Sequence, residues 1–326
     1  MPLASQFGYK SESTVGTPVT VDKFLDITSE SMKVQMGRAS ATTKRSGQRV
    51  ARSDRAVPYQ LGATGSISLP MLTKGGGILL THALGSTSTA GPTDATYTHT
   101  NTIGDLTGKS LTIQFDRPFA GGASQAFTYN GCKITKAEWS LVQGGVLEAM
   151  YEFDAWSETT ATSLASPSYA SGAEVVAFPS ASFTVAGSQV DLVDYKCTLT
   201  NGLKTDRRYI AGSASKGEQL ENAMRSITVQ FTCDFLNLTD LNRVKSTTQS
   251  GALASCILTC NGPTLLGTSA YPGYTFTTPA LQFDDADGIK VDTDDPLRVT
   301  FTGTALWDTT NSALTIAQRT ADTTPA

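Results

Sequence analysis

Apolar and polar residues alternate along most of the strongly patterned segments of this chain, and this alternation limits its fold more than any other feature. Successive side chains of a β-strand point to opposite faces, so alternation predicts half-buried strands with one apolar and one polar face. The segments with this pattern are residues 65–69, 110–115, 133–142, 147–153, 227–233 and 297–301. Two other segments, residues 72–84 and 236–244, carry apolar side chains near helical spacing. The sequence therefore predicts a mainly β protein with two short helices, each following a strand.

Charged residues make up 17% of the 326 residues, where soluble globular proteins usually carry about 25%. Thr, Ser and Ala fill most of the difference, which favours strands with uncharged polar faces. The two histidines, His82 and His99, leave little material for imidazole catalysis or a His-rich metal site. We expect His82 to be a hydrogen-bonded core or interface residue, and His99 to be a strand or loop residue without a catalytic partner.

The five cysteines form an odd set without a CxxC spacing, so at least one thiol is unpaired. We expect reduced, buried thiols, with Cys256 and Cys260 on the same face of a strand. No stretch approaches the roughly 18 continuous apolar residues that span a bilayer, and residues 1–20 lack the apolar segment of an export signal. These features predict a soluble protein without a membrane contact.

An internal repeat is suggested by the order of the segments. The length predicts about two domains, since a domain usually has roughly 100 to 200 residues. In each half a strand, a polar basic segment, a second strand, a short helix and a final strand follow one another, and the final strands end near Trp156 and Trp307. Residues 159–177 are rich in Ser, Ala, Thr and Pro, as is typical of a linker. We therefore predict two domains, residues 1–165 and 166–326.

Basic and acidic residues are concentrated in separate segments. Residues 1–165 hold 14 Lys and Arg against 13 Asp and Glu, and residues 166–326 hold 11 against 16. The basic segment contains Arg38, Lys44, Arg45, Arg49, Arg52 and Arg55, and Lys204, Arg207 and Arg208 occupy the matching place in the second half. The acidic segment contains Asp284, Asp285, Asp287, Asp292, Asp294 and Asp295. Opposite charges on one chain favour contacts between copies, so these residues are predicted to contact other copies of the chain.

Direct nucleic-acid binding is an alternative for the basic segment, because counterion release draws any arginine cluster towards phosphates. Residues 38–55 contain no aromatic side chain on which a base could stack. The net charge of the chain is −4, whereas nucleic-acid-binding domains are usually basic. A contact between copies is therefore the preferred interpretation, and a merely solvated loop is the next.

Motifs for catalysis or cofactor binding do not occur in the sequence. Residues 104–110 resemble a phosphate-binding loop but are one residue short and lead into a strand, so they predict a turn. The glycines at 75–77 predict a turn into a helix, with anion binding at the helix start as the alternative. Residues 284–288 resemble part of a calcium loop, but Pro296 stands where the last acidic ligand belongs, so a polar turn between strands is preferred. We expect no enzyme, no cofactor and no metal, and no carboxylate pair is placed for polysaccharide hydrolysis.

Several segments together resemble the tail tube proteins, or major tail proteins, of long-tailed, siphovirus-type bacteriophages. The segments that carry the resemblance are GYKSESTVGTPVT (8–20), FLDITSES (24–31), GSISLP (65–70), GILLTHALG (77–85), YTHT (97–100), GKSLT (108–112) and FTYNGCK (127–133). The resemblance is strongest over residues 8–160, and NGLKTDR (201–207) is its clearest segment in the second half. No single motif is diagnostic, but seven in the expected order are unlikely to agree by chance.

The resemblance implies two tandem, tail-tube-type twisted β-sandwich or half-barrel domains, each with a short flanking helix. In such proteins the strands of neighbouring copies join into a barrel, and the rings stack into a tube through which DNA passes during genome ejection. Tubes of this family have six-fold or pseudo-six-fold rings. Two domains per chain then imply a ring of three chains with pseudo-six-fold symmetry, and a true hexamer is the alternative. The polar strand faces would line the channel, and the basic and acidic residues named above would make inter-ring or inter-subunit contacts.

The partners implied are further copies of the chain, the tape measure protein and viral DNA in the channel, and the tail terminator and distal tail proteins at the ends. DNA would be bound without sequence specificity, and the protein would assemble in the host cytoplasm into the virion tail. The alternative functions are another β-sandwich virion component, such as a decoration or baseplate protein, and a cell-surface adhesion module.

Overall fold

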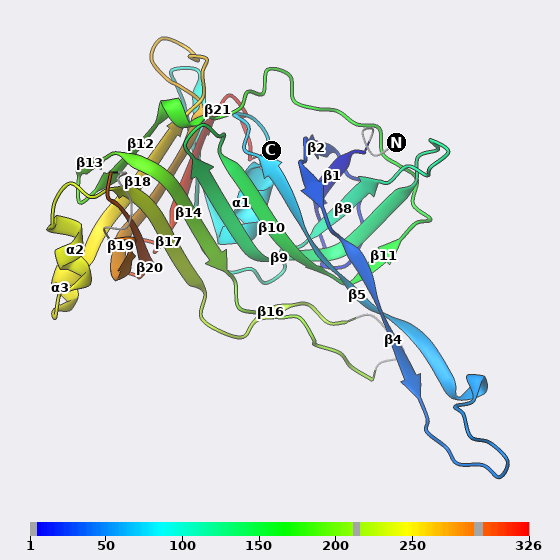
Figure 1. The fold of residues 1–326 in the computed structure, drawn as a ribbon. Helices are drawn as coiled ribbons and strands as arrows, with labels where there is room; N and C mark the ends of the chain where they lie inside the picture. Colours follow the sequence, from blue (N-terminus) through cyan, green and yellow to red (C-terminus); the bar gives the residue numbers. More distant parts are fainter. Residues whose placement is uncertain (1–4, 211–215, 290–295, 326) are drawn as a thin grey trace.

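The computed structural model describes residues 5–210, 216–289 and 296–325 (Figure 1). The strands of the first half are β1 (Phe7–Ser11), β2 (Lys23–Leu25), β3 (Ser29–Glu30), β4 (Lys33–Ser40), β5 (Ala56–Pro70), β6 (Gly85–Thr93), β7 (Thr96–Ile103), β8 (Leu111–Asp116), β9 (Ala126–Val142), β10 (Glu148–Ala155) and β11 (Ser157–Thr159). Those of the second half are β12 (Ala181–Val185), β13 (Ser188–Val190), β14 (Leu192–Thr200), β15 (Leu203–Lys204), β16 (Leu220–Glu221), β17 (Ser226–Asp234), β18 (Leu253–Asn261), β19 (Gly273–Asp287), β20 (Arg298–Ala305) and β21 (Thr315–Thr320). The helices are α1 (Gly77–Leu84), α2 (Thr239–Val244) and α3 (Gln249–Ala252), with single 3-10 turns η2 (Ser53–Arg55) and η3 (Phe178–Ser180).

The prediction of a mainly β protein is confirmed, since each alternating segment lies in or overlaps a strand. Both predicted helices form, although each begins later than its apolar pattern suggested. Gly75 and Gly76 adopt left-handed backbone angles, φ +76° and +75°, which close a turn and let α1 begin only at Gly77. Before α2, the side chains of Leu236 and Leu238 are exposed and therefore do not belong to an apolar helical face.

The prediction of a half-buried strand is wrong for β8, because all six of its residues are buried. Its second face is covered by other parts of the chain. Gln114 donates to the carbonyl of Ser163 and accepts from the amide of Ala165, and Thr112 accepts from the amide of Val19. Alternation predicts a polar face correctly here, but two long connections cover that face with backbone partners instead of solvent.

Eight antiparallel strands form the main sheet, in the order β4, β5, β10, β9, β14, β17, β20 and β19. The pairing of β9 with β14 joins the two halves of the chain, so the sheet runs through both of them (Figure 1). In the view of Figure 1, α1 lies behind this sheet. The sheet therefore has one face against the helix and the core, and a second face directed away from them.

The remaining strands pair in the same order around the two long strands, β9 and β19. In the first half β1 pairs with β2 and β8, and β8 pairs with the first part of β9. In the second half β12 pairs with β13 and β18, and β18 pairs with the first part of β19. On their other edges β9 carries β10 and β11, and β19 carries β20 and β21. The hairpin of β6 and β7 then extends the sheet beyond β21.

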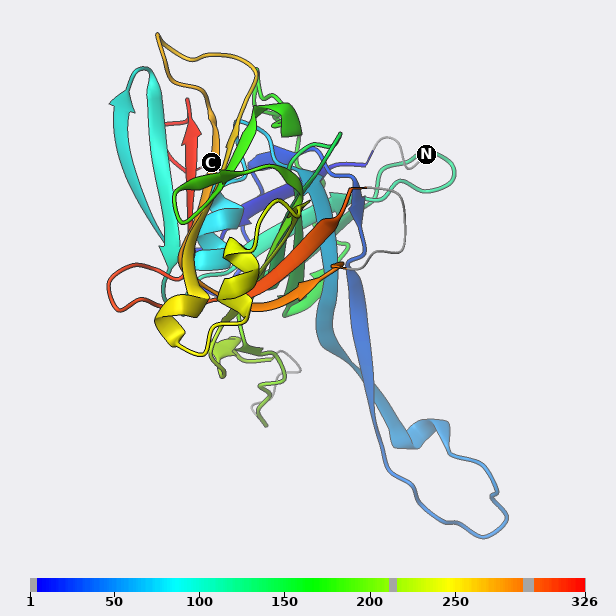
Figure 2. The same cartoon turned by 60° about the vertical axis from the view of Figure 1, so that its left-hand side comes forward.

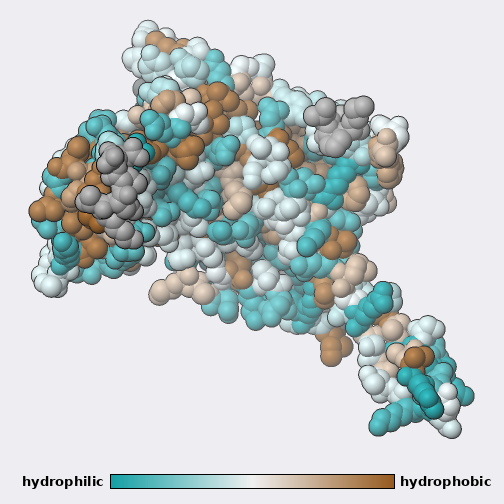
Figure 3. Space-filling model, in the orientation of Figure 1, coloured by the Kyte–Doolittle hydropathy of each residue, from teal (hydrophilic) through white to brown (hydrophobic). Residues whose placement is uncertain are grey.

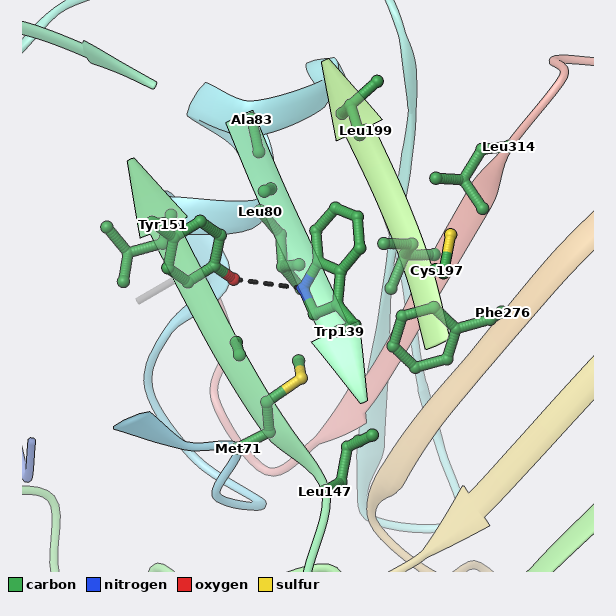
Figure 4. Packing of buried hydrophobic residues seen from close by; sticks show 14 of the residues in the cluster. Met71, Leu80, Ala83, Trp139, Leu147, Tyr151, Cys197, Leu199, Phe276 and Leu314 are labelled. Carbon is green, nitrogen blue, oxygen red and sulfur yellow. Dashed lines mark hydrogen bonds between the residues drawn. The ribbon is translucent and has the colours of Figure 1, made fainter. Parts of the chain in front are cut away.

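A single apolar core connects the two halves. Trp139 is fully buried at its centre, and the indole Nε1 donates a hydrogen bond of 3.3 Å to Tyr151 Oη (Figure 4). The Trp139 ring also packs against Phe276 of the second half, with ring centroids 6.0 Å apart. Complete burial of one large apolar side chain contributes about 1.5–3 kcal/mol to stability. Packing across the β9–β14 junction therefore holds the halves together along with the backbone ladder.

The buried cysteines and histidines are structural. All five cysteines are buried and free, and Cys256 and Cys260 point to the same buried face of β18, as predicted. His82 on α1 bonds through Nε2 to Ser11 Oγ at 2.9 Å, and His99 on β7 bonds Thr89 and the backbone of Asp322. Burial, with Lys109 and Lys133 nearby, lowers the pKa of His82 to about 3. The imidazole of His82 is therefore neutral at physiological pH.

Candidate functional site

The face of the main sheet that points away from α1 is covered by polar side chains, and we call it the polar face (Figure 3). Every second residue of the central strands points to it, and hydroxyl side chains predominate. Its uncharged polar residues are Thr64, Ser66, Ser68, Ser140, Thr198, Thr200, Ser226, Thr228, Gln230, Thr232, Thr300, Thr302 and Thr304. Val142 and Met150 are apolar exceptions on this face. The predicted polar face of the strands is confirmed across this sheet.

On β9, β14 and β20, the exposed cations of the polar face are paired with carboxylates of the same face. The ion pairs are Lys136–Glu152 at 3.2 Å, Lys196–Glu138 at 2.8 Å and Arg298–Asp234 at 3.3 Å. Glu148 and Asp194 lie on the same face, and neither forms an ion pair within the part of the chain that the structure describes. With the buried residues Lys133 and Asp154 included, β9, β10, β14, β17 and β20 carry four cations and six carboxylates, a net charge of −2. The polar face is therefore weakly acidic, and it offers a polyanion no unpaired cation on these strands.

The basic segment does not form the simple loop expected from the sequence. Residues 37–59, which we call the arm, form a hairpin of the outer parts of β4 and β5 that projects from the molecule (Figures 1 and 2). Arg38 lies within β4 and Arg55 within η2, whereas Lys44, Arg45, Arg49 and Arg52 lie in the connecting loop. Strand pairing extends into the arm, where Arg38 faces Pro58 and Gly37 faces Tyr59 in the β4–β5 register.

Few side chains of the arm contact the rest of the molecule. Its one ion pair in the described chain joins Arg52 to Asp54 within the arm, at 2.5 Å. Two apolar side chains of the arm are exposed, Val50 to 82% and Val57 to 66%. Exposed arginines and apolar side chains on a projecting hairpin are typical of a surface that binds another molecule.

The connection from β14 to β17, at the matching place in the second half, is folded against the first half. Lys204 pairs with Asp206 at 2.9 Å on the surface. Arg207 donates to the carbonyl of Glu218 and to Tyr209 Oη, and Arg208 is exposed on the same connection. The structure thus places these three predicted contact residues on a docked segment. It does not bring them together with the residues of the arm.

Two buried ion pairs fix this connection. The ammonium of Lys216 lies 2.6 Å from both carboxylate oxygens of Asp154, and both side chains are almost fully buried. Lys133, also buried, binds Glu218 at 2.6 Å and donates to two backbone carbonyls. Gln219 adds a bond of 2.8 Å to Asp154. Sequence reasoning missed these residues, and the one local signal for Lys133 was its place between two apolar residues, Cys132 and Ile134.

The acidic segment differs from its prediction as well. Asp284, Asp285 and Asp287 lie at the end of strand β19 and not in a turn. Asp284 accepts bonds from Gln282 and Thr304, and Asp285 accepts from the amide of Ala286. Asp292, Asp294 and Asp295 lie outside the described residues. The described carboxylates are therefore spread along a strand edge, which differs from the arrangement of a calcium loop.

Segments considered for phosphate or anion binding use their donors internally. The amides of Gly75 and Gly76 donate to Asp322 and to Tyr9 Oη, and residues 104–110 form the predicted turn before β8. Among the residues that the structure describes, no cluster of three or more His, Cys, Asp and Glu side chains could hold a metal ion. The helices of the described chain are too short to cross a membrane.

Comparison with protein-family models identifies a match. A family model described as "Phage tail tube protein" matches residues 3–305, nearly the whole chain. No curated protein matches the sequence.

Proposed function

The chain belongs to the phage tail tube protein family and is a structural component of the virion tail, and from this premise we propose how it builds the tube. Three chains form each ring, the rings stack, and the phage is of the long-tailed, siphovirus type. The observation that carries the proposal is the weakly acidic polar face, which spans eight strands of both halves.

Two tandem units per chain, residues 1–165 and 166–326, are the first part of the proposal. Its support is the shared pairing order, in which β1, β2, β8, β9 and β10 correspond to β12, β13, β18, β19 and β20. Each unit also carries a short helix after its β5 or β17 strand. Three chains then supply six units, which fits a pseudo-six-fold ring, whereas a hexamer would supply twelve.

The polar face lines the channel in this proposal. Many unpaired arginines or lysines would retain DNA by counterion release, and paired cations in a net negative lining avoid this. Hydroxyl side chains keep the wall wet without binding a particular sequence. The tape measure protein occupies the same channel before the DNA, and the tail terminator and distal tail proteins close the ends. The arm contacts the adjacent ring.

Electron microscopy of the purified chain and of isolated tails tests this proposal. We expect the chain to form rings or tubes as its concentration rises, and isolated tails to contain it along their whole length. Monodisperse monomers at high concentration, together with absence from isolated tails, would contradict the proposal.

The charge of the lining is tested by replacing two carboxylates of the polar face that form no ion pair in the described chain, Glu148→Lys with Asp194→Lys. Tubes should still assemble, and genome release from the resulting virions should slow, most clearly at low salt. Glu148→Gln with Asp194→Asn is the matched control and should release its genome at nearly the normal rate. Unchanged release kinetics in the lysine variant would place the polar face outside the channel.

A further inference from the structure

The junction between β9 and β14 inside the chain shows how two tail-tube units can be joined. The second part of β9 pairs on one edge with β10 and on the other with β14. Across this junction Thr200 faces Lys136, Leu199 faces Ala137 and Thr198 faces Glu138. An ion pair of 2.8 Å between Lys196 and Glu138 also crosses it. The junction therefore has three components. These are the backbone hydrogen bonds between the two strands, the buried apolar pair Leu199 and Ala137 on one face, and polar pairs on the other face.

The second half contains the counterpart of β9 in β19. In β9 the ladder to β10 shifts register at Thr135, between Ile134 and Lys136. In β19 the ladder to β20 shifts in the same way at Asp284, between Phe283 and Asp285. The two irregularities align the strands residue by residue, so that Lys136 corresponds to Asp285, Ala137 to Ala286 and Glu138 to Asp287.

The first half contains the counterpart of β14 in β4. Thr64 of β5 faces Asp154 of β10 on one edge and Lys33 of β4 on the other. Thr228 of β17 likewise faces Thr304 of β20 and Thr198 of β14. Lys33 therefore corresponds to Thr198, Val34 to Leu199 and Gln35 to Thr200.

Both counterparts lack a strand partner along one edge in the described chain. Among the described strands, β4 pairs with β5 alone. β18 follows β19 only as far as Gln282, so the stretch from Phe283 to Asp287 pairs with β20 on one edge and with no described strand on the other. Val34 and Ala286 are half-buried in the single chain, and Ala286 packs against the core. Their counterparts at the internal junction, Leu199 and Ala137, are fully buried.

We propose that β4 of one copy pairs antiparallel with residues 283–287 of the next copy in the ring, with Gln35 opposite Asp285, Val34 opposite Ala286 and Lys33 opposite Asp287. This inference rests on the proposed function, and it specifies the strands and the register through which rings close. The occupant of each open edge is a second copy, because the chain itself supplies both counterparts of the internal junction. Charge supports the pairing, since Lys33 meets a strand end that carries Asp284, Asp285 and Asp287.

This pairing removes the two open sheet edges of the single chain. Open edges promote uncontrolled association, and closure into a ring eliminates them. It also continues the polar face across the boundary between copies, because Lys33 and Gln35 lie on the same face as Thr64. Part of the acidic segment thus acts within a ring and not between rings.

Disulfide cross-linking of assembled tubes tests the register. Residues directly opposite on antiparallel strands have Cβ atoms about 4.5–5.5 Å apart, against about 7–8 Å for diagonal neighbours. Gln35→Cys with Asp285→Cys should therefore give covalent multimers as the main oxidised product. Lys33→Cys with Asp285→Cys, displaced by two residues on the same face, should give several-fold less. Lys136→Cys with Thr200→Cys is the positive control, because it closes the equivalent pair within one chain.

Single-cysteine variants control for the native thiols, all of which are buried. If Gln35→Cys with Asp285→Cys blocks assembly, the in-register pair Lys33→Cys with Asp287→Cys decides the result. Tubes that form normally but cross-link equally well out of register, or not at all, would overturn the inference and leave the proposed function intact. Dimers from Gln35→Cys alone would also overturn it, since they would mean that two β4 edges pair. Absence of tubes from the unmodified chain would instead contradict the proposed function.

Discussion

Two connections at matching places in the chain behave in opposite ways. The β14–β17 connection is folded against the first half, where Lys216 is buried on Asp154 and Glu218 binds Lys133. The arm, which joins β4 to β5, projects into solvent, and its ion pair Arg52–Asp54 is internal. Both leave a strand of the main sheet at its end and return to the next strand of that sheet.

The difference follows from what lies beside each connection. β14 has β9 of the first half as its neighbour, so the chain after β14 meets a fixed surface and can bury charges against it. β4 has no such neighbour within the described chain. A buried ion pair needs a permanent partner, because an uncompensated buried charge is very costly. Exposed arginines suit a partner that arrives during assembly. The docked connection should therefore govern folding, and the arm should govern stacking.

The largest effect on folding is expected at the docked connection. Lys216→Met leaves the carboxylate of Asp154 buried without its cation and should lower the free energy of unfolding by about 3–5 kcal/mol. Urea denaturation of the monomer measures this. The control Lys204→Ala removes an exposed ion pair of the same connection and should cost about 0–1 kcal/mol. Equal losses in the two variants would mean that the connection is not held by its buried pair.

Acidification should have the next largest effect on the free energy of unfolding, through the buried imidazole of His82 on α1. Burial holds the pKa of His82 at about 3, whereas an unfolded histidine has a pKa of about 6.5. The free energy of unfolding is thus highest above pH 6.5 with respect to this group. It decreases as the pH falls towards 3, because the unfolded chain then binds a proton that the folded chain excludes. Between pH 7.5 and 5 this amounts to about 2 kcal/mol. The control His82→Gln should show a pH dependence flatter by that amount, and parallel curves for both proteins would contradict the assignment.

The smallest effect on folding is expected from the arm. Replacing Arg45, Arg49 and Arg52 by Glu should change the free energy of unfolding by no more than about 0.5 kcal/mol, since these side chains make no buried contact. Tube growth followed by light scattering should nevertheless be hindered, because the arm would repel an acidic partner. Normal tube growth in this variant would refute the role of the arm in stacking. A large loss of stability would mean that the arm, like the docked connection, contributes to folding.

The sequence predicted the positions of the strands better than it predicted which side chains are buried and which strand edges find a partner. Alternation found the polar face because that face depends on local periodicity alone. The outer arm was interpreted as a loop, since Arg38 and its neighbours do not alternate and pair only through the hairpin. The burial of Lys216 on Asp154 could not be predicted, because the two residues stand 62 positions apart and no local pattern marks a charge that will be enclosed. The open edges of β4 and β19 likewise depend on which strands find partners in three dimensions.

An electron cryo-microscopy reconstruction of the assembled tube would test the ring, its strand junctions and the orientation of the polar face together. We predict three chains per ring, six similar strand junctions that alternate between β9–β14 within a chain and β19–β4 between chains, and the polar face towards the channel. Six chains per ring, or a polar face on the outer wall of the tube, would contradict this prediction.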